Sequence, residues 1–294
     1  MLQQQLVNGL MLGAAYALVA IGYSLVFGVL KLVHLAHGEV FMIGAFIGLQ
    51  SVLWFKVSPV VALLAAAAGS AVLGMILELV AFRPIRARGG HFLAPMVSTI
   101  GAALVIQEVA TKLFGSEPIG FPQTGTVTSW QFGAVQVSSV QLFILLASVI
   151  SMLALHLLVA HTRYGMAMRA VAESPGTAAI LGINPNNVIL LTFAVASALG
   201  GVAGVLLGLS FNSISPYIGI DMGIKGMAIM LIGGLGNIYG AMLGGLLLGA
   251  VEVLSVAYFE SSYRDAFAFG LMIIIVLFRP QGLFGSSYHV EGRA

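Results

Sequence analysis

The side chains in this sequence that could do chemistry are few, and most are single carboxylates within long apolar runs. Glu78, Glu108 and Glu252 each lie inside a stretch of membrane length. An ionisable group in a bilayer is costly unless it faces the interior of a bundle or a water-filled cavity, so we expect these groups to point inward. They could relay protons, but buried hydrogen-bonded packing is the simpler interpretation, and Glu78 could pair with the nearby Arg83.

His34, His37 and Glu39 have the chemistry of metal ligands, but their spacing does not favour a metal site. In a helix the two histidines, three residues apart, would share a face that Glu39 does not. The chain has no cysteine, which excludes thiolate ligands. We expect neither a metal ion nor a cofactor. The segment is better explained as the start of a helix just inside the membrane, and a pathway-lining role for Glu39 stays open.

The glycine-rich run Gly233-Gly234-Leu235-Gly236 has the composition of a phosphate loop, but no strand precedes it and no Walker lysine pattern occurs in the chain. It is better interpreted as unwound backbone between two half-spans, which a membrane protein tolerates only where protein or water surrounds it. No serine, histidine and carboxylate set has a spacing that indicates catalysis. We therefore do not expect an enzyme.

The elements that position these side chains must be membrane helices. Of the 294 residues, 60% are hydrophobic and only 7% are charged, whereas a soluble domain is about a quarter charged. The apolar runs are long and continuous, which favours helices over a barrel. We predict an all-α integral membrane protein, a polytopic bundle of about eight to nine spans in one domain, residues 1–294. The net charge of +2 gives no reason to expect nucleic acid.

The chain has nine apolar segments, and two of them are short enough to be half-helices or re-entrant. The longer ones are 4–29, 58–82, 92–114, 142–159, 188–211, 240–259 and 266–278. The short ones, 40–55 and 224–235, each follow an irregular polar turn that holds a carboxylate, Glu39 or Asp221. Interrupted helices at corresponding places in inverted repeats indicate a translocation pathway. Whether the two halves form an inverted repeat stays open, since no identity between them is measurable.

The distribution of basic residues predicts the orientation. The 115–138 loop has no lysine or arginine and a strand-like piece at 126–137, so we place it outside. The cytoplasmic side then has the cluster from Arg83 through Arg88 to Gly90, the loop with Arg163 and Arg169, and Arg279. This puts the amino terminus outside and the carboxyl terminus in the cytoplasm.

Small residues at intervals of four, such as Gly200, Gly204 and Gly208, are better explained by close helix packing than by function.

Two other groups of residues are candidates for function. The mixed stretch 161–183 should form a short helix, with Ser174 as N-cap, Pro175 at the first position and Gly182 ending it. A short helix on a basic loop between two spans is a docking surface. The polar breaks supply the candidate pathway residues, each of which could equally be structural: Glu39, Asn212, Tyr217 and Asp221.

Motifs in order along almost the whole chain resemble those of permease subunits of high-affinity branched-chain amino acid ABC importers, the LivH type. The motifs include Asn8-Gly9-Leu10, the run from Gly13 to Tyr23, Ala36-His37-Gly38-Glu39, Leu181-Gly182-Ile183-Asn184 and Gly233-Gly234-Leu235-Gly236-Asn237. The resemblance implies a permease in the bacterial inner membrane. Its implied partners are a second, related permease in a heterodimer, two cytoplasmic ATPases and an extracytoplasmic binding protein that delivers leucine, isoleucine or valine.

In such permeases the loop that resembles residues 161–185 couples the permease to the ATPase. The residues that would take part are Arg169, Glu173, Ser174, Thr177, Ala178, Leu181 and Gly182. Ser174-Pro175 departs from the family pattern and puts the start of the coupling helix in doubt.

Two alternatives stay open. The first is a permease of the same family for urea, short amides or other amino acids, since close relatives transport urea and short amides and the Ala36–Glu39 motif does not separate those substrates. The other alternative is an ion-coupled secondary carrier, in which Glu39, Glu108, Asp221 or Glu252 would form the ion site.

Overall fold

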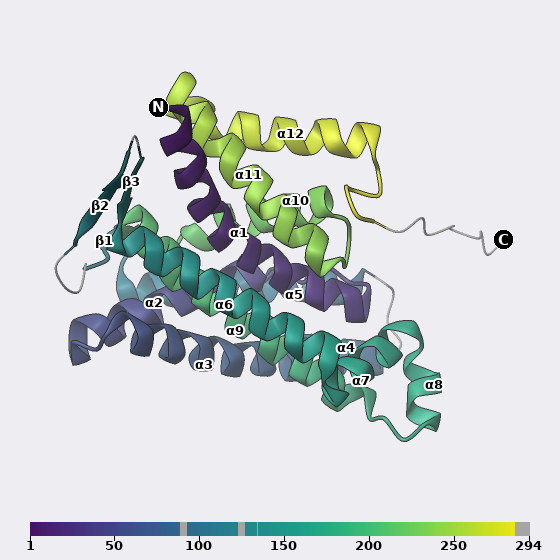
Figure 1. Ribbon diagram of the computed structural model, residues 1–294. Helices are drawn as coiled ribbons and strands as arrows, with labels where there is room; N and C mark the ends of the chain where they lie inside the picture. The colour runs from purple at the N-terminus through teal and green to yellow at the C-terminus, as the bar shows by residue number, and fades with distance from the viewer. Residues whose placement is uncertain (89–92, 123–126, 134, 286–294) are drawn as a thin grey trace.

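The computed structural model describes residues 1–88, 93–122, 127–133 and 135–285, which are almost entirely helical (Figure 1). Gly89 and Gly90 of the basic cluster and the end of the polar tail lie outside the described residues. The predicted all-α class is confirmed. The helices are α1 (Leu2–Leu30), α2 (His37–Phe55), α3 (Pro59–Leu77), α4 (Arg83–Ala87), α5 (Ala94–Phe114), α6 (Ser139–His161), α7 (Arg163–Glu173), α8 (Pro175–Ile180), α9 (Pro185–Phe211), α10 (Ile218–Gly233), α11 (Ile238–Tyr258) and α12 (Arg264–Phe278).

Among the described residues, eight helical segments are long and apolar enough to cross a membrane, within the predicted range. The segment around α2 is not short, because this helix begins at His37 and has 19 residues. α10 remains short: its 16 residues span about 24 Å at 1.5 Å per residue, less than the ~30 Å of a bilayer core. Of the two segments predicted to be short, only the one at α10 is therefore short in the structure.

The prediction that Glu39 and Asp221 lie in irregular turns is wrong. Both carboxylates lie inside helices, Glu39 in the first turn of α2 and Asp221 in the first turn of α10. The physical reason is the helix dipole, since a carboxylate in the first turn interacts favourably with the unpaired N–H groups there. The polar residues therefore mark helix beginnings, and the breaks in the helices lie a few residues earlier.

The third span is longer than predicted. After α3 the helix passes through a π-helical turn, η1 (Glu78–Phe82), and continues into α4, so the segment runs from Pro59 to Ala87. Arg86 lies eight residues after Glu78 and its Nη2 is 2.9 Å from the Glu78 carboxylate. This ion pair, rather than one with Arg83, engages one oxygen of the buried Glu78, and the other oxygen has no hydrogen-bond partner among the described residues.

The 115–138 loop contains the strands expected near 126–137. β2 (Ser129–Phe132) and β3 (Val135–Ser138) form an antiparallel hairpin. β1 (Ile119–Gly120) pairs with β4 (Ser213–Ile214), which follows α9. Gln4 bonds to Gln136 in both directions, so the start of α1 lies at the hairpin end of the bundle. We call this end the hairpin end and the opposite end, with α7 and α8, the arm end (Figure 1).

The helix pairing has the pattern of an inverted repeat. The two most extensive pairings are α1 with α11 and α3 with α9, so the first helix of each half packs on the third helix of the other. α1 begins at the hairpin end whereas α9 ends there, so equivalent helices run in opposite directions. The beginnings of α2 and α10 meet between them, where Gly38 lies against Gly219 and Gly223. These contacts support the inverted-repeat reading.

Glycines set the spacing of the α1–α11 pair. A Cβ atom on Gly13 would lie 2.7 Å from the Cα of Leu246, and one on Gly245 would lie 2.6 Å from the Cα of Ala17. Neither neighbour is a flexible side chain, so only a shift of the helices could relieve the clash. The four-residue glycine spacing is thus used for close packing here.

We expect Gly13→Ala to destabilise the protein by about 1–3 kcal/mol, the usual cost of overpacking a tight contact. A drop in the thermal unfolding midpoint in detergent would measure it. Gly101→Ala is the matched control, because a Cβ there has no heavy atom within 4 Å. Equal midpoints for the two variants would contradict the glycine-packing account.

Candidate functional site

The segment predicted to be a docking surface forms a helical arm that projects from the bundle (Figure 1). α7 starts after Thr162, whose hydroxyl accepts a hydrogen bond from the Gly165 N–H at 3.2 Å. α7 lies against the end of α6 because Gly165 has no side chain and packs on the carbonyl of Val159. α8 follows α7 and contacts it and α9.

The short helix predicted within this arm is confirmed, and so are its boundaries. The Ser174 hydroxyl accepts a hydrogen bond from the Thr177 N–H at 3.3 Å, and Pro175 is the first helical residue. Gly182 has a φ of 84°, the left-handed conformation that ends helices at glycine. The unusual Ser174-Pro175 pair therefore starts α8 at the expected place.

The tip of the arm is apolar and unprotected. Ile180 and Leu181 are 87% and 73% exposed, while Ala178 on the other face of α8 is buried. Glu173 is also exposed. Two large aliphatic side chains at the far end of a projecting helix have the character of an anchor for a protein partner.

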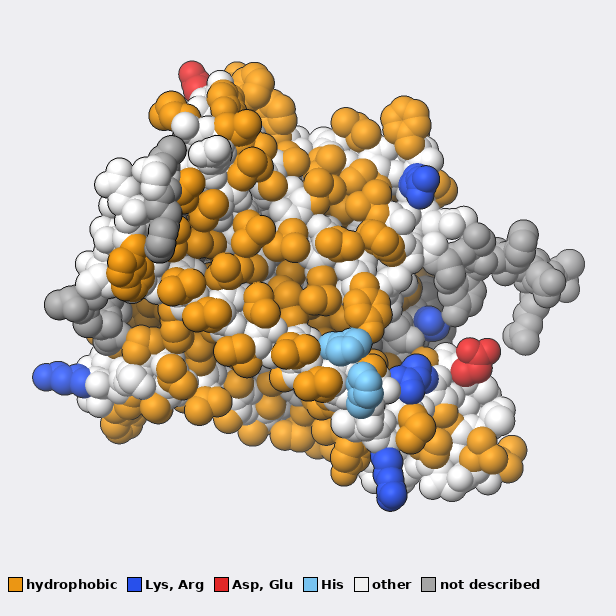
Figure 2. All heavy atoms as spheres, in the orientation of Figure 1, with side chains coloured by type: hydrophobic (Ala, Val, Ile, Leu, Met, Phe, Trp, Pro, Cys, Tyr) orange, Lys and Arg blue, Asp and Glu red, His pale blue; other side chains and the backbone are white. Residues whose placement is uncertain are grey.

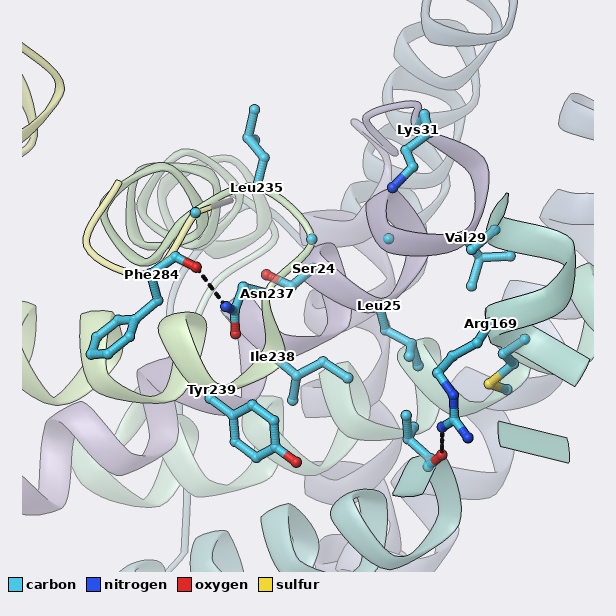
Figure 3. A pocket seen from close by; sticks show the side chains of 16 residues that line it. Ser24, Leu25, Val29, Lys31, Arg169, Leu235, Asn237, Ile238, Tyr239 and Phe284 are labelled. Atoms are coloured by element: carbon cyan, nitrogen blue, oxygen red, sulfur yellow. Dashed lines mark hydrogen bonds between the residues drawn. The ribbon is translucent and has the colours of Figure 1, made fainter. Parts of the chain in front are cut away.

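Arg169 has a different environment from the other candidate coupling residues. Its guanidinium donates a hydrogen bond to the carbonyl oxygen of Val159 at the end of α6. It also lines a cavity of about 410 Å³ among the end of α1, α7, the α10–α11 turn and the chain after α12 (Figure 3). Arg169 thus fastens the arm to the bundle instead of lying at its tip.

The glycine-rich run forms the α10–α11 turn, as unwound backbone. Gly234 and Gly236 have φ values of 109° and 78°, which an L-residue rarely adopts. Asn237 closes the turn, since its side chain accepts a hydrogen bond from the Gly240 N–H and donates one to the carbonyl of Phe284. The turn contributes to the wall of the cavity near Arg169.

The predicted pathway residues do not form one cluster. Glu39 is only 3% exposed, and its side chain fills the space beside Gly219. Asn212 ends α9 with a φ of 55°, and its carbonyl accepts a hydrogen bond from Phe121. These two residues have structural explanations: Glu39 packs where the helix beginnings meet, and Asn212 turns the chain.

Tyr217 and Asp221 are brought together on an open face of α10. They are four residues apart, hence on the same side, and both are exposed. Ile220 and Ile224 on that side are 44% and 46% exposed. The first turns of α10 lie well inside the bundle, because Gly223 lies beside the hydroxyl of Tyr23. Tyr23 is seven residues before the end of α1 at Leu30, which is about 10 Å at 1.5 Å per residue.

Glu252 is buried and hydrogen-bonded, as expected, but the ion-pair cluster around it was not predicted. Glu252 of α11 is fully buried and accepts hydrogen bonds from Tyr16 at 3.0 Å and Lys225 at 2.9 Å. Lys225 also pairs with Asp265 at 2.9 Å, and Arg264 pairs with Glu252. The cluster joins α1, α10, α11 and α12. A lone lysine in the apolar run of α10 was the available signal, since it needs a partner in lipid.

Glu108 contradicts the expectation that intramembrane carboxylates point inward. It is 65% exposed on α5 and pairs with Lys112, one turn later, at 3.4 Å. Lys112 is two residues from the end of α5 at Phe114, where a long side chain can reach the membrane surface. Among the described residues no group of three or more His, Asp or Glu side chains could hold a metal ion.

Comparison with known proteins adds independent information. Residues 5–276 match the family model described as branched-chain amino acid transport system / permease component. The chain is 41% identical to the high-affinity branched-chain amino acid transport system permease protein BraD of Pseudomonas aeruginosa, over 96% of this chain and 95% of BraD. It is 37% identical to LivH of Escherichia coli, with the same coverage.

A more distant relative is the permease protein LivM of Escherichia coli. The identity is 25%, over 91% of this chain and 67% of LivM. No solved structure matches the chain.

Proposed function

Because this chain belongs to the family of permease components of branched-chain amino acid transport systems, we propose that it carries leucine, isoleucine and valine into the cell. It is a multi-pass membrane protein of a bacterial ABC system and a transport subunit rather than an enzyme. ATP hydrolysis would be supplied by partner subunits. The observation that carries the proposal is the family match over nearly the whole chain, together with a projecting apolar arm.

The proposed assembly has two permeases, two cytoplasmic ATPases and an extracytoplasmic binding protein. The similarity to both LivH and LivM supports a heterodimer of related permeases, with this chain as the LivH-type subunit. Co-purification from native membranes with mass spectrometry tests this. A second, related permease and two ATPases are expected, and a homodimer of this chain would contradict the heterodimer.

We place the arm end in the cytoplasm and the hairpin end outside. The arm end has Arg163 and Arg169 on α7 and Arg86 at the end of the third span, as the positive-inside rule requires. The amino terminus then lies outside and the described chain ends in the cytoplasm, where the ATPases are.

In this arrangement α8 is the coupling helix. Its anchors would be Ile180 and Leu181, which sit in a groove of the ATPase, while Ser174, Thr177 and Gly182 fix the ends of the helix and Ala178 its buried side. Arg169 would transmit the movement, because its bond to Val159 ties α7 to the end of α6. Glu173 is exposed and free to meet a basic group on the ATPase.

The open face of α10, with Tyr217 and Asp221, would line the pathway at the contact with the second permease. An exposed carboxylate at this depth cannot face lipid without a large cost, so a polar surrounding must cover it. In the pathway it would attract the ammonium group of the passing amino acid. Glu39, one helix behind, would support this face from within the bundle.

Asp221→Asn is expected to lower ATP-driven leucine uptake about tenfold or more, since a hydrogen bond to a charged group contributes about 1.5–3 kcal/mol. Uptake into proteoliposomes that contain the full transporter measures the effect. Glu108→Gln is the matched control, an exposed carboxylate of another span whose partner is Lys112. Unchanged uptake by Asp221→Asn, or an equal loss with Glu108→Gln, would count against the pathway assignment.

The two alternatives make different predictions. Of the carboxylates that an ion-coupled carrier could use, Glu252 already pairs with two cations and Glu108 with one, which leaves Glu39 and Asp221. An imposed proton or sodium gradient should then drive uptake by this chain alone. A urea or amide permease would have the same arm. A ligand screen on the co-purified binding protein separates these substrates from the branched-chain amino acids.

A further inference from the structure

The cavity of about 410 Å³ beside the arm has a wall of strongly mixed chemistry (Figure 3). Two of its lining residues are cations, Lys31 at the end of α1 and Arg169 on α7. In Figure 3 the amine of Lys31 points toward the cavity. Among the described residues that line it, none is Asp or Glu. The cavity therefore favours a negatively charged group.

Neutral hydrogen-bonding groups lie beside these cations. Ser24 is among the lining residues, but it is fully buried and its hydroxyl, which has no partner among the described residues, is closed to a group bound in the cavity and could be reached only through a buried water. A buried polar atom without a partner is uncommon and indicates a missing ligand or water. The Asn237 amide also lines the cavity, held by its hydrogen bond to the carbonyl of Phe284 (Figure 3). The cavity thus offers both charge and hydrogen bonds to one anionic group.

The cavity also borders the apolar belt of the protein. Tyr239 lines it, is 55% exposed and bonds to His156 of α6 at 2.9 Å. From there, exposed leucines continue along α11 and α6 toward the hairpin end, namely Leu243, Leu247, Leu153 and Leu157. Figure 2 shows this apolar band ending beside histidine and basic side chains. Tyrosine at such a border is typical of the membrane–water interface.

We propose that this cavity binds the headgroup of an anionic phospholipid, with its acyl chains along the α6–α11 stripe. Lys31 and Arg169 would pair with the phosphate. Basic pockets between helices at a membrane surface bind such headgroups. A zwitterionic amino acid fits less well, because its ammonium group would find no carboxylate here. The lipid would join the arm to α1 and the α10–α11 turn.

In the test, the purified transporter complex exchanges lipid with vesicles that contain both phosphatidylglycerol and phosphatidylcholine. Native mass spectrometry then measures how much of each lipid the complex retains. The wild type should retain phosphatidylglycerol selectively. Each cation near an anionic headgroup contributes about fivefold in binding. Lys31→Gln should therefore weaken the selectivity about fivefold, and the double variant Lys31→Gln with Arg169→Gln should weaken it about thirtyfold. Lys31→Gln is scored first, because Arg169 also anchors α7.

Arg163→Gln is the matched control, since this exposed arginine is on α7 and does not line the cavity. Its lipid selectivity should equal that of the wild type. Equal retention of both lipids by the wild type, or an equal loss with Arg163→Gln, would overturn the proposal. Displacement of the lipid by millimolar inorganic phosphate or glycerol phosphate would show a site for soluble anions instead, which also contradicts a lipid site.

Discussion

Leu181→Asp is expected to abolish ATP-driven leucine uptake while leaving the permease folded. Leu181 is 73% exposed at the tip of the arm, so a charge there costs the isolated chain little. In a docked complex the aspartate would be buried in an apolar groove. Loss of an interface anchor commonly costs 2 kcal/mol or more, which is about thirtyfold in affinity. Retention of the ATPases on affinity-purified permease, and uptake by reconstituted vesicles, measure the two consequences.

Leu181→Met is the matched control for this result, because it keeps an apolar side chain of similar size. Ile180→Asp should reproduce the loss, since Ile180 is even more exposed, at 87%. If Leu181→Asp retained the ATPases and transported leucine at the normal rate, α8 would not be the coupling helix. A loss with Leu181→Met as well would point to a defect in folding instead.

Glu252→Gln is expected to destabilise the permease by about 3–5 kcal/mol. The carboxylate accepts from Tyr16, Lys225 and Arg264, and it is fully buried. Its removal leaves Lys225 as a buried cation, with the half-solvated Asp265 as its remaining carboxylate partner in the cluster. Breaking a buried pair by removing one partner is costly for this reason. Thermal unfolding of the purified protein in detergent measures the loss.

A second variant separates charge from shape. Glu252→Gln combined with Lys225→Met removes both charges of the buried pair, so the double variant should be more stable than Glu252→Gln alone. Additive effects of the two substitutions would contradict the contact between Lys225 and Glu252. Asp265→Asn is the milder comparison, because that side chain is 64% exposed and its pairing is screened by water.

Much of the fold could be predicted because its signals are local. Long apolar runs determine the spans, and the order Ser174, Pro175, Gly182 determines α8 to the residue. The strands after Phe114 also follow from a short stretch of β-forming residues. In each case the residues that indicate the structure are neighbours in the sequence, so these predictions required no knowledge of distant contacts.

The buried charges depend on distant contacts, so their environments could not be predicted. Lys225 and Glu252 are 27 residues apart and meet only because α10 packs on α11. Glu108 was expected to be buried, yet α5 is at the edge of the bundle and shows that face outward. A sequence shows that a charge lies in an apolar run, but not which side of the helix the rest of the chain covers.

The same limit explains the mixed outcome for the candidate site. Glu39 and Asp221 have similar positions, each in the first turn of a helix. The structure covers Glu39 and leaves Asp221 exposed, because the two halves of the chain pack differently around these helices. Only the exposed one retains a direct part in the proposed pathway.

The most direct measurement is leucine uptake into proteoliposomes that contain this chain, the second permease and the two ATPases, with the binding protein supplied at the outer side. Uptake should require ATP on the ATPase side and should stop when any one of these components is omitted. Uptake by this chain alone, driven by a proton or sodium gradient without ATP, would contradict the account.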